Sequence, residues 1–186
     1  MATAQHNTAK KLTDWTQKDA GSSADRSVDV YFSADVETDG PIPGPFSILS
    51  FALVFAGVFD GGDFLRPEQY SETFYRELKP ISENFEPEAL RVNGLDRARQ
   101  CIQGEDSRPA MTAASRWVSQ IAGHGKPVLV AYPLSFDWAW LYWYFIRFSS
   151  NPHRSSATWF LTFWTKSGKP ITDFSACLLY KALLLQ

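Results

Sequence analysis

Apolar and polar residues alternate along residues 28–35, where Val, Val, Phe and Ala are interleaved with Asp, Tyr, Ser and Asp. A repeat of two residues predicts a β-strand. The long apolar run at residues 46–59 predicts a second, buried strand, and Asp-Gly-Gly-Asp at residues 60–63 predicts a hairpin-like turn after it. Residues 73–78 fit a third strand that ends before Pro80. Because turns join these strands, an antiparallel meander is predicted.

The repeat changes to that of helices in the second half of the chain. A short helix is predicted at residues 87–92, ended by an Asn-Gly pair, and a longer helix begins near Pro109. Residues 128–131 are wholly apolar, which predicts a central strand covered on both faces. Further helices are predicted at residues 136–148 and within residues 171–185. This order predicts an α/β fold, in which a mixed sheet carries helices on its faces.

The composition is that of a globular protein with one domain. Of 186 residues, 45% are hydrophobic and 20% are charged, which is unlike a disordered chain. Residues 1–27 are polar and lack a signal-peptide core, so they are predicted to be a flexible tail before a domain at residues 28–186. No charge-free stretch within residues 128–148 is long enough to cross a membrane, and no membrane partner is expected. The two cysteines form no disulfide framework, which predicts a reducing, cytoplasmic location.

Charge is unevenly distributed, although the formal net charge is only −2. After Asp137 there are five basic residues and one acid, Asp173, whereas the chain up to Asp137 is acidic. This arrangement suits a protein that binds cations in one place and a polyanion beside it.

Three acids are the candidates for chemistry. Asp35 and Glu37 are two residues apart on a predicted strand, so their side chains point to the same face and repel each other unless a cation lies between them. Mg²⁺ or Mn²⁺ would relieve that repulsion, but a solvated strand end is an alternative interpretation. Asp137 follows the strand at residues 128–131, and it could equally be an ordinary acid at a helix start. If that strand lies beside the first one, the three carboxylates converge.

Three blocks of sequence resemble the DEDD superfamily of 3'-5' exonucleases. Ala-Asp-Val-Glu-Thr-Asp-Gly at residues 34–40 is similar to the first motif of that family. Phe-Glu-Pro-Glu-Ala-Leu-Arg-Val-Asn-Gly-Leu at residues 85–95 resembles the segment that ends in Val-His-Gly in many members. Residues 128–137, which end in Phe-Asp, resemble the strand and second acidic motif. The order and the spacing of the blocks agree, and the resemblance covers the chain from Val28 onward.

The resemblance implies a ribonuclease H-like fold, with three antiparallel strands followed by parallel strands, and hydrolysis of phosphodiester bonds at 3' ends of single-stranded DNA or RNA by two metal ions, Mg²⁺ or Mn²⁺. Several members are dimers, so a homodimer is a further partner that the resemblance implies. By the same resemblance Asp35 bridges both metals, Glu37 holds the ion that activates water, and Asp137 helps to hold the second. The resemblance also implies that a further set of residues lies along the bound substrate: Thr38, Asp39, Gly40, Asn93 and Phe136.

The chain departs from the family pattern in two places. Tyr-Pro at residues 132–133 replaces the usual His-Asn. The third motif, His-x-x-x-x-Asp or Tyr-x-x-x-Asp, is absent, because no histidine is followed five residues later by aspartate and Lys169 stands four residues before Asp173. The sequence is therefore expected to be C-terminally incomplete and its hydrolysis weak, since a general base contributes about 10²–10⁴-fold.

Two other hypotheses stay open beside a metal-dependent exonuclease. The fold could serve as a non-catalytic nucleic-acid-binding or interaction module, or the acids could be ordinary surface residues of an α/β domain. The aromatic residues also have two interpretations. Tryptophans are concentrated between residues 138 and 164, where they could stack on bases, but the helical spacing at residues 138–148 predicts that most pack in the core.

Overall fold

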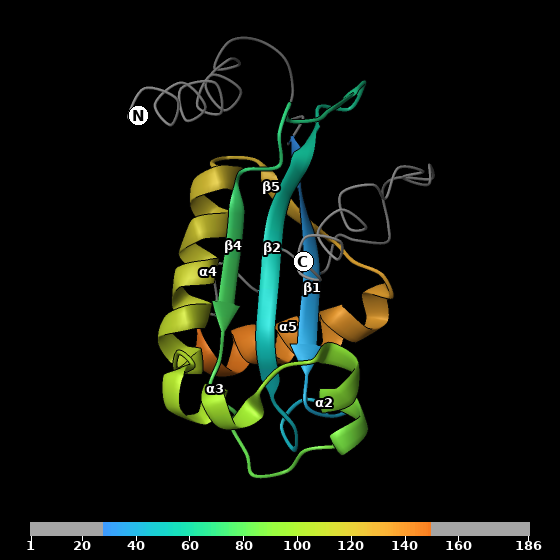
Figure 1. Cartoon of the computed structure of the whole chain (residues 1–186). Coiled ribbons are helices and arrows are strands. Elements are labelled where there is room, and N and C mark those ends of the chain that lie inside the picture. Colours follow the sequence, from blue (N-terminus) through green and yellow to red (C-terminus); the bar gives the residue numbers. More distant parts are fainter. Residues whose placement is uncertain (1–27, 150–186) are drawn as a thin grey trace, which may run out of the picture.

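The computed structural model describes residues 28–149, and its centre is a mixed β-sheet (Figure 1). The strand order is β3-β2-β1-β5, and β4 also pairs with β2. β1 is antiparallel to β2 and parallel to β5. The strands have the following bounds: β1 Asp29–Thr38, β2 Ile48–Phe59, β3 Phe64–Leu65, β4 Thr73–Glu77 and β5 Lys126–Val130.

Helices cover this sheet and close its lower end in the view of Figure 1. α4 runs along one side, α5 crosses behind the strands, and α2 and α3 gather at the end of the sheet to which β1 points. The helices have the following bounds: α2 Pro87–Asn93, α3 Arg97–Gln103, α4 Ser107–Ala122 and α5 Leu134–Phe148. None of the helices within residues 28–149 is sufficiently long and apolar to span a membrane.

The core lies between the sheet and the two long helices. β1 contributes alternate residues such as Phe32, whose ring meets Trp117 of α4 edge-on at 5.7 Å. The apolar face of α4 is buried as its spacing predicted. On α5, Trp140, Tyr144 and Phe145 are fully buried, whereas Trp138 and Trp143 are half-buried against the core. Most aromatic residues of this helix therefore pack in or against the core, as predicted, but Tyr142 is 41% exposed.

The predicted elements occur within a few residues of their expected bounds, with three differences. The two-residue strand β3 and the short helix α3 were not predicted, because neither has enough residues to show a repeat. The strand predicted to be central, β5, pairs only with β1 among the described strands, and four of its five residues are half-buried. Its first two residues, Lys126 and Pro127, suit such an edge. The predicted tail at residues 1–27 and the helix within residues 171–185 lie outside the described residues.

Candidate active site

Asp35 and Glu37 lie near the carboxyl end of β1, on the same face of that strand. Their partners in the antiparallel ladder are Ala52 and Ser50 of β2. The Asp35 side chain is buried, with 8% of its surface exposed, and Glu37 is half-buried. The strand therefore places two carboxylates side by side at the edge of the core, as the sequence pattern predicted.

Asp137 reaches the same place from the first turn of α5. β5 pairs with β1 only as far as Ser33, so it supplies no ladder partner to the backbone N–H of Val36. That N–H instead donates to Asp137 Oδ1, at 2.9 Å. Asp137 is buried, with only 3% of its surface exposed. Val36 stands between Asp35 and Glu37 in the chain, so the structure brings the third acid to the backbone that separates the first two.

The donor chemistry of this place suits a hard divalent ion, because all three side chains offer carboxylate oxygens. Within residues 28–149, however, no group of three or more His, Cys, Asp or Glu side chains is close enough to hold a metal ion. One oxygen of Asp137 already accepts a backbone hydrogen bond. The three acids thus share one end of the sheet, but the described residues do not form a three-ligand metal site.

The turn after β1 is built from the residues that follow the two acids. The Thr38 hydroxyl donates to the carbonyl of Gly40 at 2.9 Å, and Thr38 is buried. The side-chain amide of Asn93 donates to the Thr38 carbonyl at 2.9 Å, while its oxygen accepts from the N–H of Leu95 at 3.0 Å. A Cβ on Gly40 would lie 2.1 Å from the ring of Phe46, which explains why glycine stands there. Asn93 therefore fastens the end of α2 to the end of β1.

Asp39 is fully buried and joins three segments of the chain. Its carboxylate accepts from the N–H of Ser47 and forms an ion pair with Arg97, with Nε 3.0 Å from Oδ2. Its carbonyl accepts from the N–H of Glu86 at 2.8 Å. Sequence reasoning assigned Asp39 to the substrate, whereas the structure uses its side chain inside the protein and leaves it no exposed surface.

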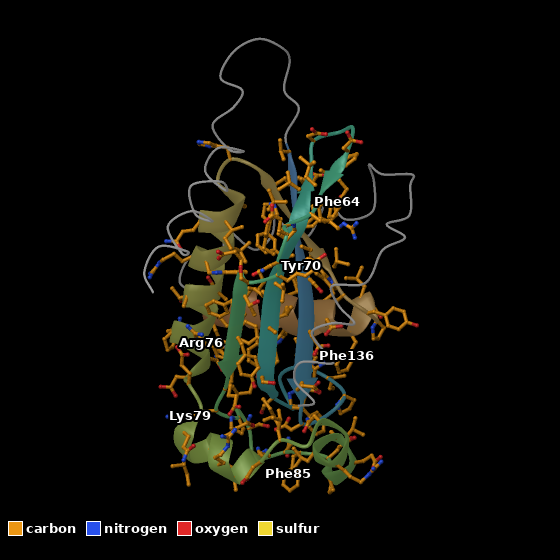
Figure 2. The ribbon with its side chains drawn as sticks, turned by 45° about the horizontal axis from the view of Figure 1, so that its top comes forward. Phe64, Tyr70, Arg76, Lys79, Phe85 and Phe136 are labelled. Atoms are coloured by element: carbon orange, nitrogen blue, oxygen red, sulfur yellow. The ribbon has the colours of Figure 1, made fainter. Side chains whose placement is uncertain are left out.

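Phe136, another of the five residues assigned to the substrate, is half-buried in the first turn of α5. Its ring lies 6.1 Å from that of Trp140, and it packs against the edge of the core. Figure 2 labels Phe136 on α5 beside the sheet, and Phe85 at the end where α2 and α3 gather. Only Phe85, of these two, is largely exposed, at 47%.

Sequence reasoning missed two residues that support this end of the sheet. One is Arg97, for which no motif gave a signal. The other is Tyr144, which the sequence did not single out and whose hydroxyl oxygen accepts from the N–H of Ile48 at 2.7 Å. Burial raises the pKa of Tyr144 far above its ordinary value, the hydrogen bond from Ile48 opposes this, and the nearby charge of Asp39 adds to the rise. α5 is thereby attached to β1 through Asp137 and to β2 through Tyr144.

Comparisons with known proteins connect this arrangement to nucleases. No protein-family model matches the chain. The sequence is 35% identical, over 126 residues, to the 3'-5' DNA exonuclease Cap18 of Escherichia coli, and the matched part is 67% of this chain and 62% of that relative. The chain thus spans less than two thirds of the length of this relative.

A solved structure of exonuclease I shares the fold. The metal-free form of the E. coli exonuclease I complex with single-stranded DNA matches with a TM-score of 0.50 and 15% identity, over 70% of this chain and 26% of the other. A further structure of exonuclease I matches with a TM-score of 0.49, 15% identity and the same coverage. The sheet with its helices is a ribonuclease H-like fold. The predicted resemblance to 3'-5' exonucleases is thus confirmed by the sequence similarity to a 3'-5' DNA exonuclease, and exonuclease I shares the fold.

Proposed function

We propose that this chain acts as a 3'-5' exonuclease, which hydrolyses phosphodiester bonds at the 3' ends of single-stranded DNA with the help of divalent metal ions. The observation that carries the proposal is the hydrogen bond from the Val36 N–H to Asp137 Oδ1, because it holds a carboxylate from α5 at the backbone between Asp35 and Glu37.

The three acids are proposed as the metal ligands. Bound Mg²⁺ or Mn²⁺ would activate water and stabilise the charge that develops on the leaving oxygen. The carboxylates of Asp35, Glu37 and Asp137 supply the hard oxygen ligands that such ions prefer. The backbone contact of Asp137 orients its carboxylate before any ion binds. The described residues bring these acids to one end of the sheet without completing a cluster, so we expect further ligands, such as water or substrate oxygens, to complete the coordination.

DNA is proposed as the substrate because the relative with 35% identity is a DNA exonuclease. Faster release of nucleotides from single-stranded RNA than from single-stranded DNA in the same assay would correct this choice. A homodimer remains a prediction, which light scattering of the purified chain would test.

The position of a general base determines the rate that the catalytic proposal predicts. Within the described residues the one histidine, His124, precedes β5 and lies next to the start of β1, at the opposite end of the sheet from the three acids. It is therefore badly placed to take a proton from an attacking water. Without such a base we expect a rate about 10²–10⁴-fold below that of a complete site.

The alternative function is a nucleic-acid-binding module that keeps the fold without hydrolysis. One observation favours it: within residues 28–149 no group of three or more His, Cys, Asp or Glu side chains is close enough to hold a metal ion. In that case the protein would bind single-stranded oligonucleotides with or without Mg²⁺ and would leave them intact.

An assay with end-labelled oligonucleotides separates the two functions. A single-stranded DNA labelled at its 3' end should release mononucleotides first from that end in Mg²⁺, and chelation of the metal should stop the release. Glu37→Gln should abolish the activity, whereas Asp63→Asn, which changes an exposed acid in the turn between β2 and β3, should retain it. Binding without release would establish the alternative, and equal release by Glu37→Gln would contradict the proposed site.

A further inference from the structure

Arg97, in the first turn of α3, connects the end of β1 to the chain that precedes α2. Its side chain is only 12% exposed. It forms the ion pair with Asp39, donates to the carbonyl of Ser82, and lies over the ring of Phe85 with its guanidinium carbon 5.1 Å from the ring centroid. One guanidinium thus contacts residues from two separate parts of the chain, both of them next to the candidate site.

The contacts of Arg97 belong to a larger attachment between the β1–β2 loop (residues 39–47) and the α2 segment (residues 81–95). The N–H of Ile81 donates to the Ser47 hydroxyl at 3.0 Å, and the Ser82 hydroxyl donates to the Pro45 carbonyl at 2.6 Å. Farther along, the N–H of Glu86 donates to the Asp39 carbonyl. The ion pair between Arg97 and Asp39 differs from these hydrogen bonds because it neutralises a buried charge. Asp39 is fully buried, and an unpaired charge is costly inside a protein.

We propose that Arg97 is a positioning residue for the exonuclease reaction: through Asp39 and Ser82 it fixes the α2 segment as one wall of the place where the 3' end binds. The inference rests on the proposed function. The α2 segment abuts the carboxyl end of β1, two residues beyond Glu37, where Asn93 and Glu86 contact the backbone of Thr38 and Asp39. It also presents exposed apolar surface to a ligand, including Val92 at 71% exposure and Phe85 at 47%.

Positioning by Arg97 has a kinetic consequence that separates it from the acids. The proposed metal ligands are on β1 and α5, whereas the side chain of Arg97 contacts Asp39, Ser82 and Phe85. Loss of Arg97 should therefore loosen the α2 segment and weaken the binding of the 3' end, while the metal ions bind as before. Because misplacement of a positioning group by about 1 Å can cost up to 10²-fold, we expect KM in Arg97→Met to rise about tenfold, with kcat changed by less than about twofold.

Two matched variants accompany Arg97→Met. Arg76→Met removes an arginine from an ion pair between β4 and Glu105, where the two side chains are 42% and 37% exposed, and it should leave KM unchanged because it lies outside the α2 segment. Arg97→Lys keeps the positive charge but loses the fork that reaches both Asp39 and Ser82, so it should restore KM only in part. A normal KM in Arg97→Lys, or a raised KM in Arg76→Met, would overturn the assignment to Arg97.

A double variant distinguishes positioning from general stability. In Arg97→Met the buried Asp39 is left without its cation, and Asp39→Asn in the same chain removes that charge. The double variant should regain much of the melting temperature that Arg97→Met loses, but its KM should stay high because the contact with Ser82 is still missing. A KM that returns to normal together with the melting temperature would overturn the proposal and leave Arg97 with a structural role alone.

Hydrogen exchange gives a readout that does not depend on activity. The N–H groups of Ile81 and Glu86 should exchange faster in Arg97→Met and in the double variant of the full chain, and at the normal rate in Arg76→Met. If the unchanged protein releases no nucleotides, the proposed function fails. If it is active and Arg97→Met has normal exchange and normal KM, the positioning role alone fails.

Discussion

Replacing Asp137 with alanine should destabilise the protein, because it removes the acceptor of a buried backbone donor. Val36 is 6% exposed and Asp137 is 3% exposed, so water cannot easily take the place of the lost carboxylate. A buried donor left without a partner costs about 1–3 kcal/mol, and a hydrogen bond to a charged group lies toward the upper part of that range. For a chain of this size each kcal/mol corresponds to about 2–4 °C in melting temperature.

The comparison with asparagine makes this prediction specific. Asp137→Asn retains a side-chain oxygen that can accept from the Val36 N–H, so it should recover much of the stability lost in Asp137→Ala. Both variants lose the carboxylate, and we expect both to lose the proposed metal-dependent activity. Asp106→Ala is the control, since this aspartate is 71% exposed and its ion pair with Lys79 lies at the surface.

Urea unfolding followed by tryptophan fluorescence measures these differences. The free energy of unfolding should fall in the order wild type, Asp137→Asn, Asp137→Ala, with Asp106→Ala close to wild type. Equal stability of Asp137→Ala and wild type would refute the reasoning, since the Val36 N–H would then have no need of this partner.

Further predictions concern the buried polar contacts and the turn after β1. Tyr144→Phe leaves the N–H of Ile48 without its acceptor and should cost about 1–3 kcal/mol, measured by the same urea unfolding. Because the pKa of Tyr144 is raised above its ordinary value of 10.0, the folded state keeps the phenolic proton that the unfolded state loses; stability should fall as pH rises above 10, and less steeply in Tyr144→Phe. Gly40→Ala should cost about 1–3 kcal/mol by overpacking against Phe46, and the smaller side chain of Phe46→Leu in the same chain should recover part of it; a neutral Gly40→Ala would contradict the close approach.

The sequence predicted the long elements and the meeting of the acids, because both follow from repeats and chain order. Alternation at residues 28–35 and the apolar run at residues 46–59 correspond to β1 and β2. The parallel pairing of β5 with β1 then brings Asp137 beside Val36, as the adjacency of those two strands required. The role of the Val36 N–H could not be predicted from the sequence. This N–H lies beyond the last β1 residue that pairs with β5, so its need for another acceptor depends on where the pairing of the two strands ends.

Polar side chains in the interior were the least predictable part. Asp39 belongs to a block that resembles a substrate-binding motif, yet its carboxylate is enclosed by Arg97 and the N–H of Ser47. The ion pair joins residues 58 positions apart, and no local repeat signals such a contact. Tyr144 shows the same limit, because no pattern in the sequence identifies the backbone N–H of Ile48, 96 positions away, that donates to its hydroxyl.

The most direct test of the central claim is the binding of Mn²⁺ to the full chain, measured by isothermal titration calorimetry with electron paramagnetic resonance of the ion. The account predicts that the wild-type protein binds Mn²⁺ and that Asp35→Asn, Glu37→Gln and Asp137→Asn each weaken the binding by tenfold or more, at about 1.4 kcal/mol per factor of ten, while Glu88→Gln binds like wild type. Mn²⁺ affinity that is the same in all five proteins, or absent from the wild type, would contradict it.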